Sequence, residues 1–207
     1  MQLYGRKLWG SMLIEPQLDW YGMAYDFVPV GDLLAAPEAR AQILPLNPVG
    51  QIPILVLDSG VVMTESAAMT LHLADLAGSD DLVPGPQAAE RAAFLRWLTF
   101  LVATLYPAYF YGDDPARFVA DEAARPAFRA ATDAHLQRMF RIVDAAAGTP
   151  WFLGEGLSAL DIFVCCMTRW RPGRDWFAAE APRLHAIALR ADSHPRLLPA
   201  WQRNLAP

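Results

Sequence analysis

Glu65 and Ser66 stand at the start of a predicted helix, where together they could bind an α-amino acid. A helix N-terminus presents free backbone N–H groups and the positive end of the helix dipole, so the Ser66 hydroxyl and these N–H groups can hold a carboxylate. The Glu65 carboxylate can accept a hydrogen bond from an ammonium group. A Glu-Ser pair alone is more often a simple helix cap, so its meaning depends on the residues around it.

The segment upstream contains a proline in a predicted strand. Two β-rich runs, Ile52–Leu57 and Val61–Met63, are separated by Asp58-Ser59-Gly60, which predicts a hairpin with a bulge. Pro53 has no N–H to donate to a strand ladder, so it must lie at an edge or at the start of its strand. This hairpin connects Gln51-Ile52-Pro53 to Glu65-Ser66.

The first 78 residues alternate between strand-like and helix-like patterns, which predicts a small mixed sheet with helices on both faces. The expected elements are a strand at Gln2–Tyr4, a helix at Met12–Tyr21 closed by Gly22, a strand at Tyr25–Val30, a weak helix at Asp32–Leu44, the hairpin, and a helix at Ser66–Leu76.

Everything after a Pro/Gly-rich linker at residues 79–87 has a helical pattern. The expected helices are Ala88–Tyr111, Ala127–Ala147, Ala159–Trp170, Trp176–Ala191 and Leu197–Asn204. Ser158 and Asp161 have the spacing of a capping box with Asp in place of Glu, and Leu157 and Ile162 that of a hydrophobic staple. We therefore expect three parts, at 1–78, 79–87 and 88–207.

Composition excludes several classes of protein. The 207 residues are 54% hydrophobic and 19% charged, which is too apolar for a disordered chain, and the net charge of −5 disfavours a nucleic-acid binder. Two adjacent cysteines, Cys165 and Cys166, predict no disulfide framework. The four histidines show no ligand spacing, so we expect no metal site. We also expect no leader and no run of membrane length, and hence a cytoplasmic protein.

The segment Asn47–Leu55, followed by Met63-Thr64-Glu65-Ser66, resembles the cytosolic glutathione transferase family, in particular its bacterial, serine-type members. The resemblance implies an α/β thioredoxin-like domain (βαβαββα) followed by an all-α helical bundle domain. It implies that Pro53 is cis, and that the backbone of Ile52 pairs with the cysteinyl part of glutathione as an added strand would. Ser66 and Glu65 then hold the γ-glutamyl end, and Gln51 reaches the glycyl end.

The resemblance further implies a hydroxyl that stabilises the thiolate of glutathione. A charge-assisted hydrogen bond of about 1.5–3 kcal/mol lowers a thiol pKa by about one to two units, so one hydroxyl suffices. Ser11 is the expected donor, with Tyr4 and Tyr106 as competitors. Gly10 stands where related bacterial enzymes often have cysteine, which excludes thiol-reductase chemistry there, and Pro16 predicts a distorted or later helix start.

The expected reaction is conjugation of glutathione, as co-substrate, to a small hydrophobic electrophile. Trp9, Tyr106 and Tyr109 are expected to line the electrophile pocket. We expect a homodimer that buries the helices Ser66–Leu76 and Ala88–Tyr111, with Ala67, Ala68, Met69, Ala92 and Ala93 allowing close approach. A non-catalytic protein of the same fold, which carries ligands or contacts partners, remains the alternative.

Overall fold

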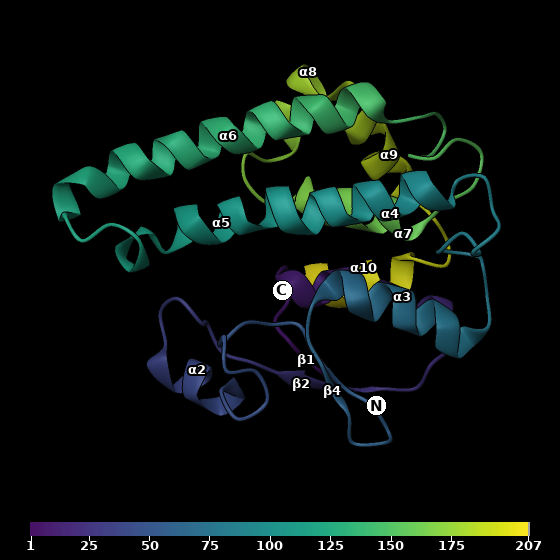
Figure 1. Cartoon of the computed structure of the whole chain (residues 1–207), viewed down its shortest axis with the longest axis horizontal. Helices are drawn as coiled ribbons and strands as arrows, with labels where there is room; N and C mark the ends of the chain where they lie inside the picture. The colour runs from purple at the N-terminus through teal and green to yellow at the C-terminus, as the bar shows by residue number, and fades with distance from the viewer. Residues whose placement is uncertain (207) are drawn as a thin grey trace. The chain divides into compact units, whose positions relative to one another are not determined.

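The computed structural model describes residues 1–206, which form two compact units (Figure 1). Met1–Gly85 and residues 191–206 make the first unit, and Pro86–Arg190 makes the second. The domain limits expected from the sequence stay a prediction. The last helix of the chain belongs to the first compact unit, whereas the other helices after residue 86 belong to the second.

The first unit has the element order βαβαββα expected of a thioredoxin-like fold, followed by the C-terminal helix. Its elements are β1 (Gln2–Gly5), the 3₁₀ helix η1 (Gly10–Leu13), α1 (Glu15–Trp20), β2 (Asp26–Pro29), α2 (Pro37–Ile43), β3 (Ile54–Val56), β4 (Val62–Met63), α3 (Ser66–Ala77) and α10 (Leu198–Leu205). The sheet order is β2-β1-β3-β4, in which β1 pairs parallel with β2 and antiparallel with β3.

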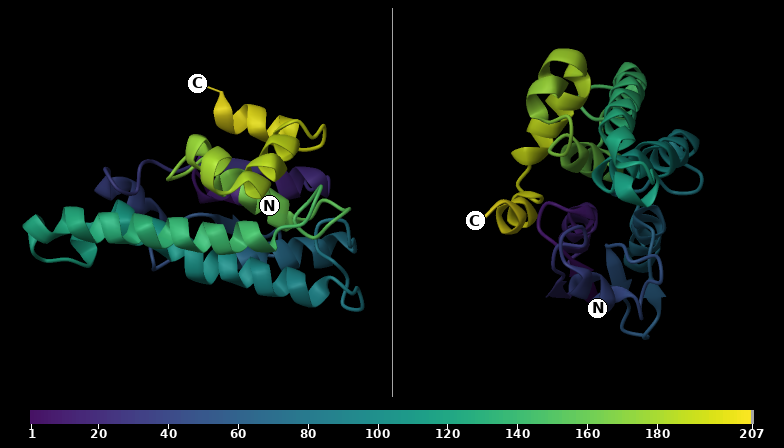
Figure 2. Two further views of the ribbon diagram at one scale, coloured as in Figure 1. Left: turned by 90° about the horizontal axis from the view of Figure 1, so that it is seen from above. Right: turned by 90° about the vertical axis from the view of Figure 1, so that its left-hand side faces the viewer.

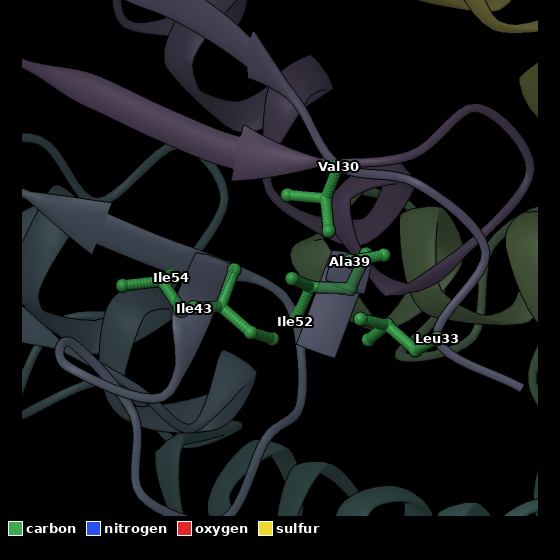
Figure 3. Close-up of a cluster of buried hydrophobic side chains, with 6 residues drawn as sticks. All are labelled: Val30, Leu33, Ala39, Ile43, Ile52 and Ile54. Atoms are coloured by element: carbon green, nitrogen blue, oxygen red, sulfur yellow. The ribbon is translucent and has the colours of Figure 1, made fainter. Parts of the chain in front are cut away.

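Alternation along the strands gives the sheet two apolar faces. Tyr4 pairs with Ile54 on the face that α2 covers, where a buried cluster combines residues of β3, α2 and the segment after β2 (Figure 3). The cluster consists of Val30, Leu33, Ala39, Ile43, Ile52 and Ile54. Leu3 pairs with Leu55 on the other face, and both are fully buried. The core of this unit therefore lies on both sides of the sheet.

The segment after β1 becomes helical in two steps because of Pro16. A 3₁₀ turn at Gly10–Leu13 precedes α1, and Pro16 is the second residue of α1, where its missing N–H forfeits no helical hydrogen bond. The predicted later start is thus confirmed. Gly22 follows the helix with φ 63°, the left-handed conformation expected of a residue just past a helix end.

An ion-pair network attaches α10 to α1. The Glu15 side chain is 4% exposed and accepts hydrogen bonds from Arg203 Nε at 2.5 Å and Asn204 Nδ2 at 2.6 Å. Arg203 also pairs with Asp19 at 2.5 Å. Because a buried carboxylate needs partners, these contacts explain why residues 191–206 belong to the first unit.

The second unit is helical. Its elements are α4 (Arg91–Phe100), a π-helical turn η2 (Leu101–Leu105), α5 (Tyr106–Asp113), the 3₁₀ turns η3 (Pro115–Arg117) and η4 (Glu122–Ala124), α6 (Arg125–Ala146), α7 (Ala159–Met167), α8 (Arg174–Glu180) and α9 (Pro182–Asp192). α5 and α6 run side by side (Figures 1 and 2). The single helix expected at Trp176–Ala191 is wrong, because Ala181 before Pro182 leaves the helical conformation and separates α8 from α9.

The predicted capping box of α7 is present. Ser158 is the N-cap, and the Asp161 carboxylate accepts from the Ser158 N–H at 2.7 Å and from the Phe152 N–H at 2.7 Å. Burial raises the pKa of the Asp161 carboxyl to about 6, although these hydrogen bonds oppose the shift.

One continuous helix of the described residues, Arg91–Asp113, is long and apolar enough to cross a membrane by length and composition. This corrects the expectation that no segment reaches that length. Several of its large side chains, including Phe94, Leu98 and Leu105, are fully or almost fully buried. The same pattern is found in core helices of folded domains.

Candidate functional site

Three segments from the first unit meet at one end of its sheet. Leu55 pairs with Met63, and just beyond this pair lie Pro53 on one side and the start of α3 on the other. Tyr4 pairs with Ile54, so the loop after β1 begins at the same end of the sheet. The fold therefore brings together the loop after β1, the Gln51-Ile52-Pro53 segment and the N-terminus of α3.

The Ile52–Pro53 peptide bond is cis, as the resemblance implied. The Ile52 side chain is 8% exposed and points into the cluster under α2 (Figure 3). Neither the N–H nor the C=O of Ile52 has a partner among the loop and turn hydrogen bonds of residues 1–206. A side chain fixed in the core and a backbone without a partner suit the addition of an extended peptide-like ligand.

The N-terminus of α3 is open. Glu65 precedes the helix with φ 64° and ψ 103°, an unusual conformation for a residue other than glycine and one found at ligand sites. The first turn has no side-chain cap and no acidic residue. Ser66 is 6% exposed, and its hydroxyl has no hydrogen-bond partner within residues 1–206. These features leave a site for an anion at this helix end.

Ser11 is fully buried, and its hydroxyl is bonded to the loop that precedes it. Oγ accepts from the Arg6 N–H at 3.1 Å and donates its only proton to the Arg6 carbonyl at 3.0 Å. The space is tight, because a Cβ on Gly5 would lie 2.3 Å from that of Ser11. In this structure the hydroxyl closes the loop between Arg6 and Ser11. Its catalytic role stays a prediction.

Tyr4 and Trp9 both pack against the cluster under α2. The Tyr4 hydroxyl donates to Gln2 Oε1 at 3.4 Å. Trp9 is half-buried, and the Arg6 guanidinium lies 5.6 Å from the centre of its ring. Trp9 thus packs against the cluster to which Ile52 belongs.

Tyr106 and Tyr109 belong to the second unit, on α5. The half-buried Tyr106 ring stacks on Trp170, with ring centres 5.4 Å apart and planes at 14°. Tyr109 is 5% exposed, and its hydroxyl donates to the Met167 carbonyl at 3.3 Å. Burial raises the pKa of Tyr109 well above its usual value. Tyr109 therefore acts as a core residue of this unit, whereas Tyr106 keeps exposed surface.

The structure adds two residues that the sequence did not assign. Asn47 is 5% exposed, and it accepts from the Val49 N–H at 3.1 Å and donates to the Gln51 carbonyl at 2.9 Å. The Arg40 side chain lies on Gly50, where a Cβ would come within 3.1 Å of Arg40 Cγ. In the sequence, the Asn47-Pro48 pair and Gly50 indicate a tight loop. Only the fold shows that α2 brings Arg40 to this loop.

Among residues 1–206, no three His, Cys, Asp or Glu side chains gather where a metal ion could be held. Cys165 and Cys166 are reduced and buried in α7.

Comparisons with known proteins agree with this geometry. A family model described as the glutathione S-transferase N-terminal domain matches residues 17–76. The uncharacterized GST-like protein YncG of Escherichia coli (strain K12) is 32% identical over 204 residues, which cover 99% of this chain and 98% of that protein. Glutathione S-transferase stcT of Emericella nidulans is 28% identical over 185 residues, covering 82% of this chain and 81% of the relative.

The fold is shared with a solved structure of a sphingomonad glutathione S-transferase complexed with glutathione. The two chains are 25% identical, the match covers 100% of each, and the TM-score is 0.79. This chain has an open α3 N-terminus and a cis-proline segment at one end of its sheet, and YncG matches it along almost its whole length. This chain therefore belongs to the glutathione S-transferase family.

Proposed function

We propose that this protein binds glutathione, stabilises its thiolate and transfers it to a small hydrophobic electrophile. The observation that carries the proposal is the meeting of the unpaired Ile52 backbone with the open N-terminus of α3. One group suits an extended peptide and the other a carboxylate. Glutathione offers both.

In the proposed complex, the Ile52 N–H and C=O pair with the cysteinyl part of glutathione. The Ser66 hydroxyl and the first N–H groups of α3 hold the γ-glutamyl carboxylate, and Glu65 accepts from the α-ammonium group. Gln51 and Arg40 serve the glycyl carboxylate, and Arg40 supplies the positive charge at that end. Pro53 keeps the segment free of a competing backbone donor.

Ser11 serves as the thiolate donor in this proposal by turning its proton from Arg6 to the sulfur. The turn leaves no buried acceptor unpaired, since the Arg6 carbonyl also accepts from the Trp9 N–H at 3.1 Å. Oγ keeps its bond from the Arg6 N–H.

The half-buried ring of Trp9 keeps surface for an electrophile in the first unit, and the half-buried ring of Tyr106 keeps such surface in the second. The near-complete burial of Tyr109 supports a role behind Tyr106, in packing, more than direct contact. No metal takes part in the proposed reaction, and we place the protein in the cytoplasm.

A homodimer is proposed, with α3 and α4 at the interface. Ala68, Ala92 and Ala93 are exposed and allow close approach, but Met69 is fully buried within its own unit and is not available. Light scattering at micromolar concentration should give twice the chain mass of 22.9 kDa, and a single species of chain mass would contradict the dimer.

The second candidate is a non-catalytic protein of the same fold that binds ligands or contacts partners. The fully buried, internally bonded Ser11 hydroxyl favours it. Retention on immobilised glutathione, combined with turnover of a generic aryl halide, separates the two. Retention with turnover supports the transferase. Retention without turnover on a panel of electrophiles supports the non-catalytic candidate. No retention and no turnover would exclude glutathione binding and with it the transferase.

A further inference from the structure

A buried chain of hydrogen bonds joins α1 to the first turn of α3. Gln17 on α1 and Thr70 on α3 are both 0% exposed. Gln17 Nε2 donates to Thr70 Oγ1 at 2.9 Å, and Thr70 Oγ1 donates to the Ser66 carbonyl at 2.8 Å. This series of hydrogen bonds therefore ends on Ser66, the residue proposed to hold the γ-glutamyl carboxylate.

Which group donates and which accepts in these hydrogen bonds follows from the chemistry of the groups. Gln17 Nε2 also donates to the Leu13 carbonyl at 2.7 Å, and a carbonyl can only accept, so the amide nitrogen must face this side. Thr70 then accepts from Gln17 and has one proton left, which goes to Ser66. The Thr70 hydroxyl is held in a single orientation as a result.

Stability alone does not explain the amide of Gln17. Its Oε1 is buried without a hydrogen-bond partner within residues 1–206, and such an unpaired buried acceptor destabilises a fold. A leucine of similar size would avoid that loss in this apolar core. A buried polar group that weakens the fold is most useful when it specifies one arrangement of the elements that it joins.

The arrangement specified here includes a ligand-binding donor. The Ser66 carbonyl and the Ala67 N–H belong to the same planar peptide group, so fixing the carbonyl also fixes the direction of that N–H. The Ala67 N–H is one of the free donors of the α3 N-terminus.

We propose that Gln17 and Thr70 are positioning residues that hold the Ser66–Ala67 peptide group in the orientation that binds the γ-glutamyl carboxylate. This inference rests on the proposed function. It also assigns a role to α1, which holds the anion site through the core. Neither residue contacts the ligand.

The test removes this series of hydrogen bonds while keeping the fold. In the double variant Gln17→Leu/Thr70→Val, both polar partners become apolar, which is nearly neutral or stabilising when shape is kept. We expect a melting temperature equal to or above that of the parent, and glutathione binding at least fivefold weaker by calorimetry. Thr70→Ser, which keeps the hydroxyl, should bind within twofold of the parent. A stable double variant that binds like the parent would overturn the proposal.

Amide hydrogen exchange without glutathione keeps this inference separate from the proposed function. The Met69 N–H, bonded to the Glu65 carbonyl at 3.0 Å, should exchange at least tenfold faster in the double variant than in the parent, relative to the Leu73 N–H in the same helix. An unchanged ratio would refute the positioning role even if the parent did not bind glutathione. Should the double variant fail to fold, Thr70→Val alone gives both readouts with the same expected directions.

Discussion

Replacing Ser11 by alanine separates a catalytic hydroxyl from one that only closes a loop. The substitution removes the bond that Oγ accepts from the Arg6 N–H at 3.1 Å and the bond that it donates to the Arg6 carbonyl at 3.0 Å. The carbonyl keeps the Trp9 N–H as a donor, so only the Arg6 N–H is left unpaired. Ser11→Ala thus creates one orphaned backbone donor beside a fully buried position.

The effect on stability follows from that count. An unpaired buried donor costs about 1–3 kcal/mol, which for a chain of this length lowers the melting temperature by about 2–12 °C. This loss is expected whichever role Ser11 has, so it serves as an internal check that the loop contact exists.

The effect on chemistry distinguishes the roles. A donor to the thiolate is worth about 1.5–3 kcal/mol, so its loss should raise the pKa of bound glutathione by about one to two units. Turnover at neutral pH should fall by roughly ten- to hundredfold, and the loss should shrink as pH rises because hydroxide then ionises the thiol. Glutathione affinity should change little, since the anchoring groups lie elsewhere.

Ultraviolet titration of the bound thiolate in the parent and in Ser11→Ala measures the shift directly. A lowered melting temperature with an unchanged thiolate pKa would refute the catalytic role and leave Ser11 as a loop contact. Tyr4→Phe and Tyr106→Phe would then be the next variants to titrate.

Three further predictions concern anchoring, the C-terminal helix and pH. Ser66→Ala and Glu65→Ala should each weaken glutathione binding by roughly five- to hundredfold, from about 1–3 kcal/mol per lost charge-assisted contact, while Ser59→Ala in the exposed hairpin turn should bind like the parent in calorimetry. Arg203→Met leaves the buried Glu15 carboxylate with Asn204 and Tyr25 as its partners among residues 1–206. It should lower the free energy of unfolding by about 2 kcal/mol in urea titrations, below the usual value for a buried pair because Arg203 is half-exposed. Arg138→Met on the exposed face of α6 is the control, and an equal loss there would contradict the Glu15 argument. Because burial raises the folded-state pKa of Asp161 from 3.8 to about 6, the stability linked to its protonation is complete below pH 4 and is lost as pH rises through 6. The free energy of unfolding of the parent, taken relative to Asp161→Asn, should therefore fall by up to about 3 kcal/mol as the pH rises from 4 to above 6. A rise in this difference over the same pH range would show that the hydrogen bonds to the carboxylate outweigh its burial.

Local chemistry was enough to predict the main elements. The turn Asp58-Ser59-Gly60 between β-rich runs specified the hairpin, Gly22 marked a helix end, and Ser158 with Asp161 specified the cap of α7. These features depend on residues within a few positions of one another, so the sequence contains all the information that they need. Likewise Pro16 was enough to indicate a delayed helix start, and the structure confirms it.

Long-range packing decided the rest. Nothing near Arg203 in the sequence indicates that it pairs with Glu15, 188 residues away, and so assigns the last helix to the first unit. The single helix expected at Trp176–Ala191 is wrong for a local reason, because Ala181, directly before Pro182, leaves the helical conformation.

The candidate site shows the same division. The residue types at Gln51-Ile52-Pro53 and Glu65-Ser66 indicated which ligand groups they could hold, because carboxylate, ammonium and backbone recognition depend on side-chain chemistry. Only the tertiary structure decided that the pairing of Leu55 with Met63 brings the cis-proline segment to the start of α3, that the Ser11 hydroxyl is bonded to Arg6, and that Gln17 reaches Thr70 through the core. Each of these depends on a distance between segments that are remote in the chain, and such distances are set by how the whole core packs.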